Sequence, residues 1–115
     1  MITVYGISNC DTIKKARKWL EQHQIEYRFH DYRKDGLTAE QLRLWVSVLG
    51  YSSLLNRRGT TWRQLPEETK ENVDASSAVA LMLKNPAMIK RPLLDKEGTF
   101  HLGFDPDTYT ALLLA

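Results

Sequence analysis

The strongest constraint on the fold is a change of hydrophobic period within the first 32 residues. Residues 2–5 are apolar and largely β-branched, and a glycine closes the run, which predicts a buried strand. From residue 11 to about residue 23 the apolar side chains recur at helical spacing. Residues 27–32 then alternate aromatic with polar side chains, as a half-buried strand does. Together these segments predict a βαβ unit with a right-handed crossover and parallel strands.

The middle of the chain has the signals of several helices. Thr38 and Gln41 have capping-box spacing at the start of a helix that a glycine ends, and residues 65–73 suggest a short helix opened by a proline. Another helix begins at Asp74 or Ser76 and stops before a proline. We expect that helix to bury three apolar side chains: Val79, Met82 and Leu83.

The last part of the chain predicts a hairpin and a helix. Residues 92–95 and 100–104 are separated by a polar turn containing a glycine, which is typical of paired antiparallel strands. Asp105 and Pro106 then suit the N-cap and the first position of a helix.

This order of elements predicts an α/β fold of the thioredoxin-like, or glutaredoxin-like, type. Its mixed four-stranded sheet would carry a helical insertion, at about residues 37–90, between the second and third strands. With 115 residues, of which 43% are hydrophobic, we expect a single domain over residues 1–115, and a monomer.

Composition excludes several classes of function. A net charge of +2 provides no broad face for nucleic acid, and no apolar run is long enough to span a membrane or resembles a secretion signal. We therefore expect a cytoplasmic location. The three histidines lack metal-ligand spacing and no glycine-rich phosphate loop is present, so we expect neither a metal nor a nucleotide.

Cys10, the only cysteine, follows the first strand and opens the first helix. Backbone N–H groups and the helix dipole would there favour its thiolate, and Asn9 or Thr12 would hydrogen-bond to the sulfur or to a bound anion. Lys14 would add positive potential, whereas Asp11 would oppose ionisation. The alternative is a small packed side chain, because free cysteines are often buried.

A reactive Cys10 would need a thiol from outside the chain. Ile13 occupies the position where thioredoxin-type dithiols have their resolving cysteine. Glutathione is the abundant thiol of a reducing cytosol, so we expect it as co-substrate. The cations at Lys14, Lys15, Arg17 and Lys18 would suit an acidic partner, but solvated helices commonly look like this, and we assign no site to them.

Residues 5–12 and 89–92, with the closing Gly103 and Phe104, resemble the ArsC/Spx family of thioredoxin-fold proteins. Residues 56–62 make the chain most similar to the YffB branch. The resemblance implies Cys10 as nucleophile and a cis peptide bond at Arg91–Pro92, which would offer backbone to a substrate, with Arg91 binding an anion.

The resemblance also implies three alternative functions. The YffB branch implies a glutathione-dependent thiol reductase that acts on a disulfide or glutathionylated substrate. The Spx branch implies a non-enzymatic regulator that docks on a protein partner, although Ile13 removes its Cys-x-x-Cys switch. The arsenate reductases of the family hold their oxyanion with three arginines; Arg91 matches one, while Asn56 and Phe104 stand at or near the other two positions.

Overall fold

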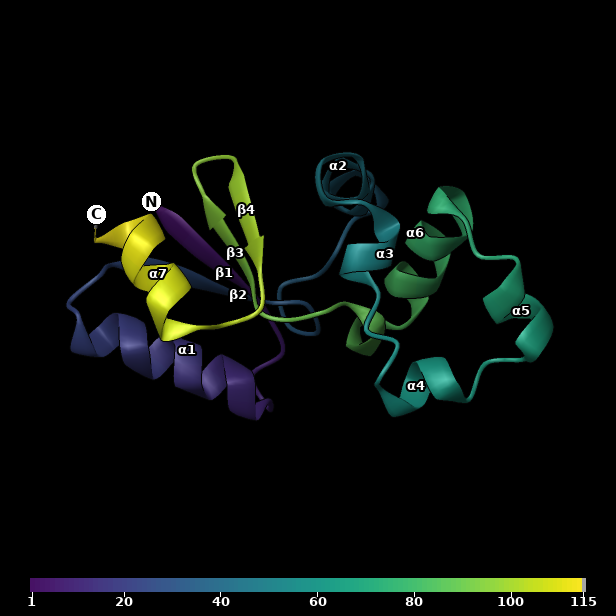
Figure 1. Cartoon of the computed structure of the whole chain (residues 1–115), viewed down its shortest axis with the longest axis horizontal. Helices are drawn as coiled ribbons and strands as arrows, with labels where there is room; N and C mark the ends of the chain where they lie inside the picture. The colour runs from purple at the N-terminus through teal and green to yellow at the C-terminus, as the bar shows by residue number, and fades with distance from the viewer. Residues whose placement is uncertain (115) are drawn as a thin grey trace. The chain divides into compact units, whose positions relative to one another are not determined.

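A computed structural model of the chain describes residues 1–114 (Figure 1). The described chain divides into two compact units. Residues 1–34 and 91–114 form the first unit, and Asp35–Lys90 form the second. The helices predicted for about residues 37–90 make up the second unit.

The first unit contains a mixed four-stranded sheet. Its strands are β1 (Ile2–Gly6), β2 (Tyr27–Asp31), β3 (Leu93–Lys96) and β4 (Thr99–Leu102), in the order β2-β1-β3-β4. β1 pairs parallel with β2 and antiparallel with β3, and β3 pairs antiparallel with β4. The predicted four-stranded sheet and its parallel first pair are therefore confirmed.

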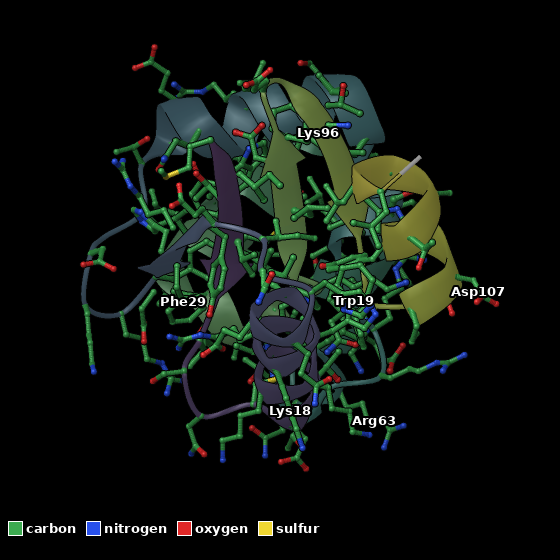
Figure 2. All side chains as sticks on the ribbon, turned by 90° about the vertical axis from the view of Figure 1, so that its left-hand side faces the viewer. Lys18, Trp19, Phe29, Arg63, Lys96 and Asp107 are labelled. Carbon is green, nitrogen blue, oxygen red and sulfur yellow. The ribbon has the colours of Figure 1, made fainter. Side chains whose placement is uncertain are left out.

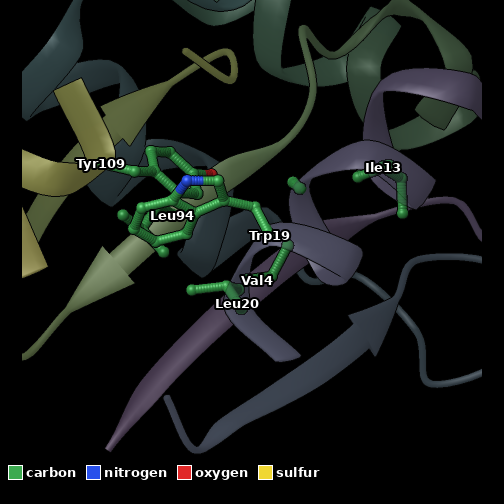
Figure 3. Close-up of a cluster of buried hydrophobic side chains, with 7 residues drawn as sticks. Val4, Ile13, Trp19, Leu20, Leu94 and Tyr109 are labelled. Carbon is green, nitrogen blue, oxygen red and sulfur yellow. The ribbon is translucent and has the colours of Figure 1, made fainter. Parts of the chain in front are cut away.

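Two helices, α1 (Asp11–Gln22) and α7 (Pro106–Leu113), pack on the same face of this sheet. Figure 3 shows the buried cluster that joins them, with side chains from β1, β3 and both helices. Trp19 meets the ring of Tyr109 edge to face, with centroids 5.6 Å apart. In Figure 2, Trp19 lies on the side of α1 toward α7, while Lys18 points outward. The cluster consists of Val4, Ile13, Ala16, Trp19, Leu20, Leu94 and Tyr109.

The second unit is helical throughout its regular structure. It comprises α2 (Ala39–Leu49), α3 (Tyr51–Leu54), α4 (Thr60–Arg63), α5 (Glu67–Glu71), α6 (Ala75–Lys84) and a 3₁₀ turn (Pro86–Met88). The predicted capping box of Thr38 and Gln41 is confirmed, and Asp74, rather than Ser76, is the N-cap of α6. Among the described residues, no helix has the length and apolar character needed to cross a membrane.

Two sequence predictions about the second unit are wrong in detail. Leu83 is 40% exposed, and Ala78 is buried with Val79 and Met82 instead, because the buried face of α6 lies on the other side of Met82. Pro66 is the N-cap of α5 rather than its first residue, and that helix covers only five residues of the span predicted as 65–73.

The predicted hairpin and the last helix are confirmed. Glu97 and Gly98 connect β3 to β4 with φ values of 50° and 93°, as a tight turn that matches strand twist requires. The carboxylate of Asp95 accepts a hydrogen bond from the N–H of Gly98 at 2.8 Å. Asp105 accepts from the N–H of Thr108 at 3.1 Å, with Pro106 in the first helical position.

Gly6, at the end of β1, allows α1 to approach the sheet closely. A Cβ atom there would clash with Cδ1 of Ile13 and lie 3.0 Å from its Cγ1. Because Ile13 is fully buried, we expect Gly6→Ala to lower the free energy of unfolding by about 1–3 kcal/mol, measured by urea denaturation. Gly59→Ala is the control, since its φ of −76° suits alanine and its nearest contact is a side-chain amide; it should cost clearly less. Equal losses would contradict this account.

Candidate functional site

Cys10 is the N-cap residue of α1, at the end of the turn that leaves β1. Its backbone is extended, with φ −148° and ψ 128°, and its carbonyl accepts the N–H of Lys14 at 3.0 Å. The side chain makes no capping hydrogen bond, is half-buried, and packs against the edge of the buried cluster. The thiol thus rests on apolar surface and keeps access to solvent.

Arg91 is far from Cys10 in the sequence but contacts it in the folded chain. Its Nε donates a hydrogen bond to Sγ of Cys10 at 3.3 Å, across 81 residues of sequence. The Arg91–Pro92 peptide bond is cis, as predicted. Pro92 is buried, and its carbonyl accepts the N–H of Gly103 at 2.9 Å. The structure therefore brings together Cys10 and the Arg-Pro pair that the resemblance implied.

The surroundings of Cys10 favour its charged form. Partial burial acts to raise the pKa of the thiol, but a backbone hydrogen bond from Ile13, the hydrogen bond and positive charge of Arg91, and the N–H of Thr12 outweigh it. The pKa of Cys10 is therefore below its ordinary value. Lys14 is not among the main causes, so the contribution expected from that lysine is not seen.

Asn9 and Thr12, the other predicted substrate-binding residues, flank the cysteine. The side chain of Asn9 is exposed, and that of Thr12 is half-buried in the first turn of α1. Neither side chain hydrogen-bonds to the sulfur in the described part of the chain, so Thr12 acts on the thiol through its backbone N–H alone. The substrate-binding role of these two side chains stays a prediction.

Asp31, which sequence analysis missed, fixes the turn before Cys10. This carboxylate at the end of β2 is only 4% exposed and accepts hydrogen bonds from the N–H groups of Ser8 (3.2 Å) and Arg33 (2.8 Å). Burial acts to raise its pKa, but the hydrogen bonds of Arg33, Ser8 and Lys34 give a net lowering. In the sequence, the one signal was the position of this acid at the end of a predicted strand. The structure shows that the neighbouring Tyr32 is buried as well.

No group of three or more His, Cys, Asp or Glu side chains is arranged to hold a metal within residues 1–114. The groups that surround Cys10 are the guanidinium of Arg91 and the backbone N–H groups of a helix N-terminus.

The fold and this site define a class: a thioredoxin-like protein with one cysteine at a helix N-terminus, hydrogen-bonded to an arginine that precedes a cis proline. The chain belongs to the ArsC family, whose model matches residues 5–112. This confirms the family that the sequence resembles.

Three of the proteins that are similar to this chain illustrate its relationships within the family. A solved structure named YffB protein is 48% identical, covers 98% of this chain and 99% of its own, and has a TM-score of 0.93. An ArsC-related protein from Brucella melitensis is 55% identical, covers 96% and 92%, and has a TM-score of 0.82. The global transcriptional regulator Spx of Streptococcus pyogenes is 25% identical over 98% of this chain and 85% of its own length.

The contact between Arg91 and Cys10 predicts a measurable change in the thiol. Arg91→Met removes the donor and the charge but keeps most of the side-chain volume, so we expect the pKa of Cys10 to rise toward its ordinary value. The measurement is the pH dependence of alkylation by iodoacetamide. Arg33→Gln, at an exposed position, is the control and should leave the midpoint unchanged. A midpoint that does not move in Arg91→Met would contradict the assignment.

Asp31 predicts a pH-dependent contribution to stability. Its folded-state pKa is lowered, so the contribution is complete above the unfolded value of about 3.9 and disappears as pH falls through the folded value. Asp31→Asn should lower the free energy of unfolding by about 1–3 kcal/mol at pH 7, and the difference from wild type should shrink below pH 4. Urea denaturation across pH tests this; a difference that is constant with pH would refute it.

Proposed function

We propose that the protein is a monothiol reductase that uses glutathione and acts on a disulfide or glutathionylated substrate, with Cys10 as nucleophile. The observation that carries the proposal is the thiol whose pKa is lowered by the first turn of α1 and by Arg91, 3.3 Å from Sγ. A thiolate is the attacking species in disulfide exchange, so a lowered pKa keeps more of it available near neutral pH.

The first step transfers glutathione from the substrate to the protein. The Cys10 thiolate attacks the glutathione sulfur of a glutathionylated thiol, a new S–S bond forms at Cys10, and the substrate leaves as a thiolate that takes a proton from water. Arg91 would bind an anionic group of the incoming substrate. The half-buried position of Cys10 lets a peptide disulfide reach the sulfur from one side.

The second step regenerates the thiol with external glutathione. A glutathione thiolate attacks the mixed disulfide, oxidised glutathione leaves, and Cys10 departs as a thiolate. The groups that lower the pKa of Cys10 also make it a good leaving group. Ile13 explains the need for an outside thiol, because it occupies the position of a resolving cysteine and is fully buried. The chain has no other cysteine.

Arsenate reduction is the less favoured enzymatic function. A solved relative from Streptococcus mutans, 29% identical, is named a possible arsenate reductase, but this chain has Asn56 and Phe104 at or near two of the positions where the family resemblance implies arginines. The side chain of Phe104 has no hydrogen-bond donor for an oxyanion. Its ring packs against that of Tyr109, with centroids 4.8 Å apart. Arg57 lies over the ring of Trp62 at 5.5 Å and donates to Ser52. Losing paired guanidinium forks would weaken an oxyanion site.

A regulator that docks on a protein partner is the non-enzymatic alternative, supported by the similarity to Spx. Such a protein would need no poised thiolate, so the lowered pKa of Cys10 favours the reductase.

Turnover separates these functions. The purified protein should remove glutathione from a glutathionylated peptide in the presence of glutathione. The oxidised glutathione formed is reduced by added glutathione reductase, and the oxidation of NADPH is followed by absorbance. Cys10→Ser should abolish turnover, and Arg91→Met should lower kcat/KM at pH 7 by roughly tenfold, in line with its effect on the thiolate. Arsenate in place of the peptide is the comparison. Turnover of arsenate alone would replace the reductase proposal, and turnover of neither would favour the docking protein.

A further inference from the structure

A row of cations runs along α1 from the thiol. Lys14, Arg17 and Lys18 follow Cys10 at intervals of four, seven and eight residues, which places them on one face of the helix; we call these three the basic stripe. Lys15 lies beside it. Lys14 and Lys18 are exposed, and Figure 2 shows Lys18 pointing outward from α1.

The charge pattern of α1 mixes favourable and unfavourable pairs, because Asp11 precedes Lys14 and Glu21 follows Lys18 at helical spacing while the cations between them are close to one another. Cations stabilise a helix near its C-terminus, yet the last turn of α1 has none, and the basic residues stand in its second and third turns. Lys14 faces Arg17 and Lys18 at i,i+3 and i,i+4, where like charges repel. Within residues 1–114, no carboxylate lies within 4.0 Å of a basic-stripe nitrogen. Among the described residues, Lys14 and Lys18 thus have no ion-pair partner on the helix that begins at the thiol.

Part of the basic stripe is held in place. Arg17 donates from Nε to the hydroxyl of Tyr27 at 3.0 Å, and its guanidinium lies 4.3 Å from the ring centre of Phe29. The same Tyr27 hydroxyl donates to Glu21 at 3.2 Å. These contacts border an open hollow of about 530 Å³ lined by Lys14, Arg17, Lys18, Glu21 and Gln22. The hollow is therefore lined by cations at the end nearer Cys10 and by the carboxylate of Glu21 at the other end.

We propose that the basic stripe binds an acidic segment of the disulfide substrate, so that the substrates are proteins or peptides with carboxylates close to the reacting cysteine. This inference rests on the proposed function and names its substrate class. Lys14 and Lys18 lie about 6 and 12 Å along the helix from Cys10, at 1.5 Å per residue. An extended peptide advances about 3.3 Å per residue, so the carboxylates belong two to four residues from the substrate cysteine.

Substrate recruitment and thiol activation use different groups. Ile13, Arg91 and Thr12 lower the pKa of Cys10, whereas the lysines of the basic stripe are not among its main causes. Neutralising Lys14 and Lys18 should therefore weaken the encounter with acidic peptides and leave the thiolate intact. If this helix face were only solvated, the protein would react with acidic and neutral peptides at the same rate, and neutralising the two lysines would change neither rate.

A single-turnover reaction tests this without glutathione. Peptides with one cysteine activated as the 2-pyridyl disulfide react with the Cys10 thiolate, forming the Cys10–peptide disulfide and releasing pyridine-2-thione, which is followed by absorbance. One peptide carries two glutamates two and four residues from the cysteine, and its partner carries glutamines. At low ionic strength we expect the acidic peptide to react about tenfold faster, the lower end of electrostatic steering, and added salt to remove the difference.

Matched variants locate the effect. Lys14→Gln/Lys18→Gln should react with both peptides at the rate of the neutral one, with an unchanged alkylation midpoint. Arg28→Gln/Lys96→Gln removes the same charge from exposed positions paired with the start of β1, at the opposite end of that strand from Cys10, and should keep the preference. Equal rates for both peptides in wild type, or a preference that survives in Lys14→Gln/Lys18→Gln, would overturn the docking proposal. A thiol inert to both peptides would instead overturn the reductase function on which it rests.

Discussion

The contact between Arg91 and Cys10 is the interaction on which the site depends. It exists because β1 pairs antiparallel with β3, with Tyr5 opposite Leu93. That register carries the residues before β3 past the end of β1, to the turn where Cys10 begins α1. The charge state of the sulfur is therefore a property of the sheet as much as of the helix. Slipping this pairing by one residue would turn every side chain of β3 to the opposite face and remove the guanidinium from the thiol.

The same end of the sheet collects the other groups that shape the thiol. β1 and β2 are parallel, so their carboxyl ends lie together, and Asp31 at the end of β2 holds the N–H of Ser8 in the turn from β1. Gly6 leaves room for Ile13 beneath that turn. The short loop between β1 and α1 is thus held by the buried carboxylate of Asp31, by the close packing that Gly6 allows, and by Arg91. The helix can then present backbone N–H groups to the sulfur from a fixed position.

Sequence predicted the parts of this arrangement that local chemistry decides. Capping boxes, the hairpin glycine and the aspartate and proline that open α7 act over a few residues, so their spacing is visible in the chain. The cis bond at Arg91 came from family resemblance, whereas a thiolate at Cys10 was also predicted from its position before a helix. Asp31 escaped notice because its partners come from a different strand end, and Leu83 was misplaced because helical spacing does not reveal where the buried face ends. Both depend on tertiary contacts that periodicity does not contain.

One helix meets three demands that conflict in part. The buried face of α1 anchors the first unit, its first turn favours the thiolate, and its exposed face carries cations that repel one another. The magnitudes show why the conflict is tolerated. A like-charge pair on a helix costs about 0.2–0.5 kcal/mol, whereas burying one large apolar side chain contributes about 1.5–3 kcal/mol. Ile13 and Leu20 alone, both fully buried, outweigh the repulsion within the basic stripe. The core of the first unit therefore tolerates a cluster of cations on the exposed face of α1.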